Sequence, residues 1–298
     1  MEFFKTVLPE DHILMEEPMD RHTTFRIGGP AECFITVDTR EQLAKVFSYL
    51  QRADWDFFLL GNGSNLLVGD RGYRGVVIRL GEAFGKVTAQ GSRISAGAGA
   101  MLGTAAKAAL ERGLSGLEFA SGIPGTIGGA VRMNAGAYGG EMAQIVESVE
   151  VMGMDGEILT LDNETMEFGY RTSAIKNRPY VVMNVVMKLQ EGDTEQIRER
   201  MQELSEKRRE KQPLDYPSAG STFKRPEGNF AGKLVMDAGL SGKSCGGAQI
   251  SEKHCGFIIN KGNATAADVA QLIREATETV QDKFGVTLEP EVIFLGDF

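Results

Sequence analysis

Hydrophobic and polar positions along the chain follow two periods, one typical of strands and one typical of helices. Alternating or continuous apolar runs predict strands over 33–37, 57–60, 75–80, 93–96, 149–152, 158–161 and 181–189. Apolar residues at helical spacing predict helices after Thr39, over 104–113, over 194–212 and over 265–284, and a last strand is expected over 286–295. The order of these elements indicates a mixed α/β (α+β) protein.

Local signals refine two of these helices. Thr39 with Gln42, and Thr265 with Asp268, have the spacing of capping boxes, and Gly285 is placed to end the last helix. The helix over 194–212 is highly charged with a thin apolar stripe, as expected of a solvated connector. We therefore predict a boundary near 190, with a first lobe over 1–190 that divides into two α/β subdomains near 60–75. The second lobe is expected over 191–298, with the option that its last strand, about 286–298, returns to the first lobe.

Composition and charge narrow the class of protein. The 298 residues include 41 acidic and 32 basic side chains, a formal net charge of -9, which argues against a broad nucleic-acid surface. No apolar stretch approaches the ~20 residues of a membrane span, and residues 1–17 carry acids where a signal peptide carries bases. Three cysteines without a C-x-x-C pair indicate reduced thiols and give little support to a metal site. The sequence predicts a cytoplasmic protein without nucleic-acid or membrane partners.

Glycine is the most unusual feature of the composition. The chain has 37 glycines, and nine of them fall within 113–140, a density too high for a helix interior. There are two glycine loops, 61–65 and 121–130, and the first matches neither a Walker loop nor the G-x-G-x-x-G fingerprint. The first loop alone is equally well explained as a plain turn. Two such loops about one subdomain apart suit a long, bipartite ligand whose phosphates approach the backbone.

Five blocks in order make the chain similar to the UDP-N-acetylenolpyruvoylglucosamine reductase family, over nearly its whole length. They are Gly61-Asn62-Gly63-Ser64-Asn65-Leu66-Leu67-Val68, the block 121–139 with Met133-Asn134-Ala135-Gly136-Ala137-Tyr138-Gly139, Tyr170-Arg171-x-Ser173, Gly220-Ser221-x-Phe223-Lys224-x-Pro226, and Leu288-Glu289-Pro290-Glu291-Val292. The spacing between Tyr170 and Ser221 resembles the shorter subtype, which lacks an extra substrate-covering tyrosine loop.

This resemblance implies a flavoenzyme of peptidoglycan precursor synthesis. It implies an FAD-binding lobe of the vanillyl-alcohol-oxidase type and a C-terminal substrate lobe. NADPH is expected to reduce FAD, which then reduces UDP-N-acetylglucosamine enolpyruvate to UDP-N-acetylmuramate. FAD is expected to be non-covalent, because neither loop offers histidine or cysteine for attachment. The residues implied to contact FAD are Arg26, Gly61, Asn62, Gly63, Ser64, Asn65, Ser121, Gly122, Pro124, Gly125, Thr126, Ile127 and Gly129.

Three residues are implied to be catalytic. Arg171 pairs with the substrate carboxylate and stabilises the enolate-like intermediate, Glu291 is the second stabilising residue, and Ser221 donates the proton. Without the resemblance, each residue has a purely structural interpretation: Arg171 would form a surface ion pair, Glu291 would lie in a solvated turn and Ser221 would cap a turn.

Substrate contacts are implied for Tyr170, Lys224, Arg225, Lys243 and His254, the last of which also reads as an ordinary surface histidine. This chain has Ser241 where the family more often has lysine, so Lys243 is only a candidate replacement for a diphosphate contact. Two alternatives stay open. A different FAD oxidoreductase of the same fold, such as an alcohol oxidase, would reduce oxygen rapidly, and a catalytically silent nucleotide-binding protein would purify colourless.

Overall fold

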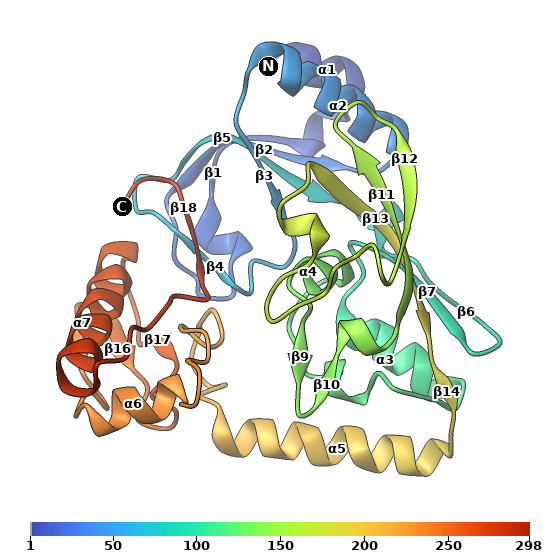
Figure 1. Ribbon diagram of the computed structural model, residues 1–298. Helices are drawn as coiled ribbons and strands as arrows, with labels where there is room; N and C mark the ends of the chain where they lie inside the picture. Colours follow the sequence, from blue (N-terminus) through green and yellow to red (C-terminus); the bar gives the residue numbers. More distant parts are fainter. Residues whose placement is uncertain (1) are drawn as a thin grey trace. The chain divides into compact units, whose positions relative to one another are not determined.

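The computed structural model describes residues 2–298, which form two compact units (Figure 1). Of the described residues, the first unit contains 2–14, 34–61 and 76–208, and the second contains 15–33, 62–75 and 209–298. The chain passes between them five times: within β1 (Ile13–Pro18), within β2 (Pro30–Val37), after Gly61 in the loop that follows β3 (Phe57–Leu60), within β5 (Tyr73–Leu80) and within α5 (Thr194–Lys211). The chain enters the second unit for the last time inside α5, between residues 208 and 209, whereas we predicted a boundary near 190. The assignment of lobes to 1–190 and 191–298 stays a prediction.

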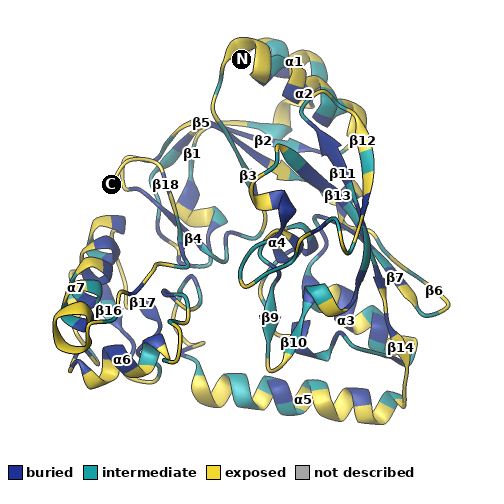
Figure 2. Ribbon diagram, viewed as in Figure 1, coloured by how far each residue is buried: buried dark blue, intermediate teal, exposed yellow. Residues whose placement is uncertain are grey.

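The first unit is built on a five-stranded antiparallel sheet. Its strand order is β12 (Ile158–Asp162), β11 (Val146–Gly153), β13 (Tyr180–Lys188), β7 (Arg93–Gly97) and β6 (Val87–Gln90). Figure 2 shows that β11 and β13 are buried along most of their length. Helices α3 (Leu102–Glu111) and α4 (Ile127–Arg132) pack against this sheet. Small residues such as Ala105 and Ala109 line the buried face of α3, so the helix can approach the strands closely.

Smaller elements complete the first unit. Helix α1 (Glu2–Val7) packs on α2 (Arg40–Ala53), and β3 (Phe57–Leu60) pairs in parallel with β5 over residues 76–79. Two short antiparallel pairs are β8 (Leu114–Ser115) with β14 (Gln190–Glu191) and β9 (Gly136–Ala137) with β10 (Gly140–Glu141). Thr39 forms the predicted capping box with Gln42, which explains why α2 begins at Arg40.

The second unit places its helices against a small sheet. Strands β15 (Ser244–Cys245), β16 (Ala248–Ile250) and β17 (Ile258–Asn260) form the sheet, which packs against α7 (Ala266–Phe284), and α6 (Ala231–Asp237) packs on α7. Strand β18 (Ile293–Leu295) pairs in parallel with β4 (Leu66–Val68). The apolar face of α7 lies in the core, and Thr265 and Asp268 form the predicted capping box.

Most predicted elements are confirmed. The expected last strand is shorter than predicted, because residues 286–292 precede β18 without joining it and Pro290 has no amide hydrogen for a ladder. The apolar stripe of α5 is confirmed, since Ile197 and Leu204 are buried and Figure 2 shows most of this helix exposed. Elements α1, α6, β1, β4 and β15 to β17 were not predicted, because their apolar runs are short.

Candidate active site

The two glycine loops meet within the first unit. Gly61 follows β3, and a Cβ atom at this position would lie 2.7 Å from the hydroxyl oxygen of Thr126. Glycine at position 61 therefore lets the first loop lie directly against the second. Thr126 also closes the second loop, since its hydroxyl caps α4 by accepting from the amide of Gly129 at 3.4 Å. This contact brings together two loops that lie about one subdomain apart in the sequence, and their binding of one bipartite ligand stays a prediction.

The second loop is fixed on the segment that follows β7. The amides of Ile127 and Gly128 donate to the carbonyls of Ala100 and Ala98, both at 2.8 Å. Ile127 and Gly129 therefore shape the loop, because their amides are already bonded inside the protein. Among the predicted residues before Ile127, a phosphate contact through backbone amides would fall to Gly122, Gly125 and Thr126, because the amide of Ser121 donates to the carbonyl of Glu118 at 3.3 Å and Pro124 has no amide hydrogen.

Arg208, near the end of α5, contacts the second glycine loop, and the sequence analysis did not predict this contact. Its guanidinium donates to the carbonyl of Gly122, and burial lowers the pKa of this arginine. A side chain at Gly122 would also come within 3.1 Å of the Arg208 Nε atom. The sequence showed a charged, solvated helix and no sign that one of its arginines reaches the glycine loop.

The rest of the first glycine loop belongs to the second unit and packs on residues 22–24. Gly63 has a φ of +60°, and a Cβ here would lie 2.1 Å from the carbonyl oxygen of His22. The carbonyl of Gly63 accepts from the amide of Thr24 at 3.3 Å. Arg26 follows in a turn with a φ of +54°, and its side chain is exposed. The buried side chain of Asn260 donates to the carbonyl oxygens of Phe25 and Arg26 and so holds this turn.

Asn65 connects the first glycine loop to the segment that carries Glu291. Its side-chain amide donates to the carbonyl of Glu291 at 3.0 Å, and its own carbonyl accepts from the amide of Ile293 at 3.0 Å. These two bonds extend the parallel pairing of β4 with β18. The Asn65 side chain, which we expected to contact the cofactor, is thus used to hold the backbone of a candidate catalytic residue.

Ser221 and Glu291 lie on adjacent segments of the second unit. The amide of Glu291 donates to the carbonyl of Thr222 at 2.8 Å, and Phe223 forms an isolated antiparallel bridge with Pro290. Thr222 is buried, and its hydroxyl accepts from the amide of Ile258 at 3.1 Å. The structure therefore brings two of the three predicted catalytic residues together, with Thr222 at the centre of the contact. Ser221 itself is exposed.

Arg171, the third predicted catalytic residue, lies at the tip of a tight turn in the first unit. Gly169 and Thr172 exchange backbone hydrogen bonds of 3.1 and 3.3 Å, and Arg171 has a φ of +55°. The guanidinium carbon lies 5.2 Å from the ring centroid of Tyr170, a cation–π distance. Tyr170 is 56% exposed, so the turn presents both predicted residues at the surface of the unit.

The predicted substrate contacts of the second unit are engaged with neighbouring groups. Lys224 pairs with Glu289 at 2.8 Å, Lys243 pairs with Glu275 of α7 at 2.6 Å, and the guanidinium of Arg225 stacks on Phe230. A diphosphate would have to compete with two carboxylates for these lysines.

His254 is half-buried and in contact with neighbouring groups. It packs against Phe257, its Nδ1 atom accepts from the amide of Gly256 at 3.1 Å, and burial lowers its pKa. These contacts favour the neutral ring with its proton on Nε2.

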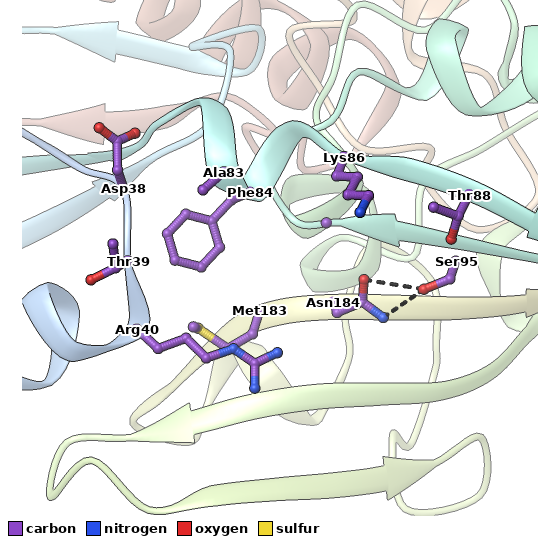
Figure 3. Close-up of a pocket in the computed structure, with 11 residues that line it drawn as sticks. Asp38, Thr39, Arg40, Ala83, Phe84, Lys86, Thr88, Ser95, Met183 and Asn184 are labelled. Atoms are coloured by element: carbon purple, nitrogen blue, oxygen red, sulfur yellow. Dashed lines mark hydrogen bonds between the residues drawn. The ribbon is translucent and has the colours of Figure 1, made fainter.

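A separate pocket of about 440 Å³ lies between the start of α2 and strands β7 and β13 (Figure 3). Its polar side chains are largely paired with one another or with neighbours: Arg40 with Glu150, and Asn184 with Ser95 at 2.9 and 3.3 Å. No residue that we predicted for the site lines this pocket, and we do not assign it to the active site.

Family models match most of the chain. A model of the UDP-N-acetylenolpyruvoylglucosamine reductase C-terminal domain matches residues 212–295, and an FAD binding domain matches residues 31–162. The FAD binding match contains both glycine loops, and the C-terminal match contains Ser221 and Glu291. The glycine loops, with a Cβ excluded at Gly61 by Thr126, fit a cofactor that contacts backbone at two places.

Relatives and solved structures agree with these matches. UDP-N-acetylenolpyruvoylglucosamine reductases of Caldanaerobacter subterraneus and Agathobacter rectalis are 51% and 50% identical, covering 98% and 99% of this chain and 97% and 99% of theirs. The crystal structure of the Thermus caldophilus reductase matches with a TM-score of 0.82 and 40% identity, over 95% of this chain and 98% of that one. A Phl p 4 variant described as a glucose oxidase is 14% identical with a TM-score of 0.51 over 65% of this chain and 44% of that one, which shows a shared fold only.

The predicted fold class is therefore confirmed as an FAD-binding fold of the vanillyl-alcohol-oxidase type joined to a C-terminal reductase domain. The chain belongs to the UDP-N-acetylenolpyruvoylglucosamine reductase family of FAD-dependent oxidoreductases.

Proposed function

We propose that Arg171, Glu291 and Ser221 carry out the reaction of this family in this chain. The reaction is the NADPH-dependent reduction of UDP-N-acetylglucosamine enolpyruvate to UDP-N-acetylmuramate, a step of peptidoglycan precursor synthesis. FAD, when bound, carries the hydride from NADPH to the enol ether carbon. The observation that carries the proposal is the hydrogen bond between Glu291 and Thr222, because it places the Glu291 segment beside Ser221.

Each of the three residues has a distinct task. The Arg171 guanidinium pairs with the carboxylate that is conjugated to the reacting carbon and stabilises the charge that develops there. Glu291 is the second group that stabilises this intermediate. Ser221 donates a proton to the adjacent carbon, and its position after Gly220, whose φ is +76°, fixes where the hydroxyl is presented.

Both glycine loops supply residues to hold FAD in this proposal. Gly61 and the residues from Ser121 to Thr126 offer backbone that a phosphate can approach closely, and Arg26 adds a positive charge in the second unit. The assignment of Asn62, Gly63 and Ser64 to the cofactor rests on their place in the same loop.

The sugar nucleotide requires cations for its diphosphate, which Lys224, Arg225 and Lys243 are proposed to supply, and Tyr170 and the neutral ring of His254 are proposed as further substrate contacts. Lys224, Arg225, Lys243 and His254 lie in the C-terminal domain match, and the lysines would exchange their present carboxylate partners for the substrate. We place the activity in the cytoplasm, on small-molecule partners alone, because the net charge of -9 disfavours nucleic acid. Among residues 2–298, no helix is long and apolar enough to span a membrane.

NADPH oxidation by the purified protein tests this assignment. We expect one NADPH consumed for each enolpyruvyl sugar nucleotide added, and acid precipitation should release the flavin into the supernatant because its attachment is non-covalent. Arg171→Ala should leave flavin reduction by NADPH nearly intact and slow reoxidation by substrate. NADPH oxidation that needs only oxygen would instead support the oxidase alternative, and full reoxidation in Arg171→Ala would remove this arginine from the mechanism.

A further inference from the structure

Asn134 is a buried polar residue that lies between the second glycine loop and the Arg171 turn. It follows α4, whose first turn is capped by Thr126 of the loop, and its side chain is 2% exposed. Its φ of +41° is uncommon for a residue other than glycine, although asparagine tolerates this region better than most. A buried amide in this conformation indicates that its hydrogen bonds determine its place.

Both ends of the Asn134 amide are used. Its Nδ2 atom donates to the carbonyl of Gly169 at 3.0 Å, and its Oδ1 atom accepts from the amide of Ala143 at 2.9 Å. Gly169 is the first residue of the turn that presents Arg171 and is bonded to Thr172 at the other end of that turn. The donor arm of Asn134 therefore fixes the start of the turn.

Ser173 fixes the other end of the same turn. It is 2% exposed, and its hydroxyl donates to the carbonyl of Arg132, the last residue of α4, at 3.1 Å. Arg132 at the end of α4 and Asn134, two residues further on, thus bond the Arg171 turn on its two sides, while the start of α4 belongs to the glycine loop. One short helix connects the proposed FAD loop to the proposed catalytic arginine.

We propose that Asn134 is a positioning residue for Arg171, with Ser173 as its counterpart on the far side of the turn. This inference rests on the proposed role of Arg171. The strained φ of Arg171 makes the positioning necessary, because a turn that relaxes would move the guanidinium away from the substrate carboxylate. A misplacement of about 1 Å at such a contact can cost ~10²-fold in rate.

Asn134→Asp removes one of the two side-chain hydrogen bonds and keeps the other. An ionised carboxylate still accepts from the amide of Ala143 and cannot donate to the carbonyl of Gly169. We expect flavin content and flavin reduction by NADPH to stay within about twofold of the parent, and reoxidation by substrate to fall ~10- to 100-fold. Lowering the pH should recover part of the reoxidation rate, because a protonated carboxyl group regains a donor. A merely structural role predicts instead that flavin reduction is lost and recovered together with reoxidation.

Asn163→Asp is the matched control. Asn163 lies in the same unit and also bonds the backbone at residue 143, donating to the carbonyls of Ala143 and Val146 at 2.9 and 2.7 Å, without touching the Arg171 turn. At each pH, the rates of flavin reduction and of reoxidation in Asn134→Asp are compared with the same two rates in Asn163→Asp. If both variants slow the two half-reactions equally, Asn134 only maintains the fold and the proposal is wrong.

A double mutant distinguishes failure of the inference from failure of the proposed function. Asn134→Asp combined with Arg171→Ala should reoxidise no more slowly than Arg171→Ala alone, because a positioning residue acts through the arginine. Additive losses would overturn the inference while leaving Arg171 catalytic, whereas an unaffected Arg171→Ala would overturn the proposed function itself. Should Asn134→Asp not fold, Ser173→Ala carries the same test, with loss of reoxidation expected and unchanged reoxidation contradicting it.

Discussion

The side-chain amide of Asn65 donates a hydrogen bond of 3.0 Å to the backbone carbonyl of Glu291. This bond joins the first glycine loop to the segment that carries a proposed catalytic carboxylate, and it lies within one unit of the protein. The loop therefore has a second task besides approaching a cofactor. Its last residue fixes the backbone from which Glu291 is presented.

Asn65→Ala should thus damage the step that uses Glu291. We expect reoxidation of the reduced flavin by substrate to slow about tenfold, while the dissociation constant for FAD changes much less. Stopped-flow absorbance of the two half-reactions, together with FAD titration of the apoprotein, measures both quantities. Weakened FAD binding with normal reoxidation would show that the side chain serves the cofactor instead.

The ion pair of Lys243 with Glu275 allows a sharp test of the diphosphate assignment. Lys243→Ala should raise the KM for the sugar nucleotide about tenfold and leave flavin reduction by NADPH unchanged. Glu275→Gln removes the same ion pair but keeps the lysine, so we expect substrate affinity to be retained. Both variants should unfold at nearly the parent denaturant concentration, because an ion pair whose side chains are 43% and 29% exposed contributes only ~0 to 1 kcal/mol.

Substrate affinity that is lost equally in both variants would mean that the ion pair, rather than the lysine, maintains the site. Unchanged affinity in Lys243→Ala would remove this residue from the site and leave no substitute for the lysine that the family more often has at Ser241.

The sequence predicted the elements whose signals are local. Capping boxes, the periodicity of 40–53 and 266–284, and the alternation of β11 to β13 depend only on neighbouring residues, and each is found in the structure. The short strands of the second unit escaped prediction because runs of two or three residues carry no period. Family resemblance, rather than periodicity, led to the prediction that the glycine loops form one cofactor site.

Contacts between distant segments could not be predicted in the same way. Three such contacts depend on tertiary packing: the hydrogen bonds from Asn134 to Gly169, from Arg208 to Gly122 and from Asn65 to Glu291. Each of these residues is polar and therefore reads as solvent-exposed in a sequence alone. Their roles become visible only once burial and hydrogen-bond partners are known.

His254 should make the stability of the protein fall on acidification. Burial holds its pKa below the ordinary 6.5, so between the two values the unfolded chain binds a proton that the folded protein does not. This contribution to stability is complete above the unfolded pKa and is lost as the pH falls through 6.5 toward the folded value. His254→Asn keeps an acceptor for the amide of Gly256 and cannot be protonated.

Urea unfolding of the two apoproteins at about pH 7.5 and pH 5.5 measures this effect. We expect the parent to lose more stability on acidification than His254→Asn. The same loss in both proteins would show that other groups account for the pH dependence.

Ser221→Ala should separate the two half-reactions of the enzyme. NADPH reacts before the enol ether does, so the loss of a proton donor to the substrate carbon should leave flavin reduction nearly intact. Reoxidation by substrate should slow by ~10² to 10⁴, the usual contribution of a positioned general acid. Ser221→Cys should recover part of this loss, since a thiol can also donate a proton although its larger sulfur is placed differently.

A structural role for Ser221 makes a different prediction. Ser221 follows Gly220 in a turn and precedes Thr222, which bonds the amide of Glu291, so a disturbed turn would damage flavin content, stability and both half-reactions together. Thr222→Val is the comparison variant. It removes a buried hydroxyl that accepts from the amide of Ile258, so it should disturb the fold without removing the proposed proton donor. Reoxidation of Ser221→Ala at close to the parent rate would exclude this serine as the proton donor, and damage that matches Thr222→Val would assign it to the turn.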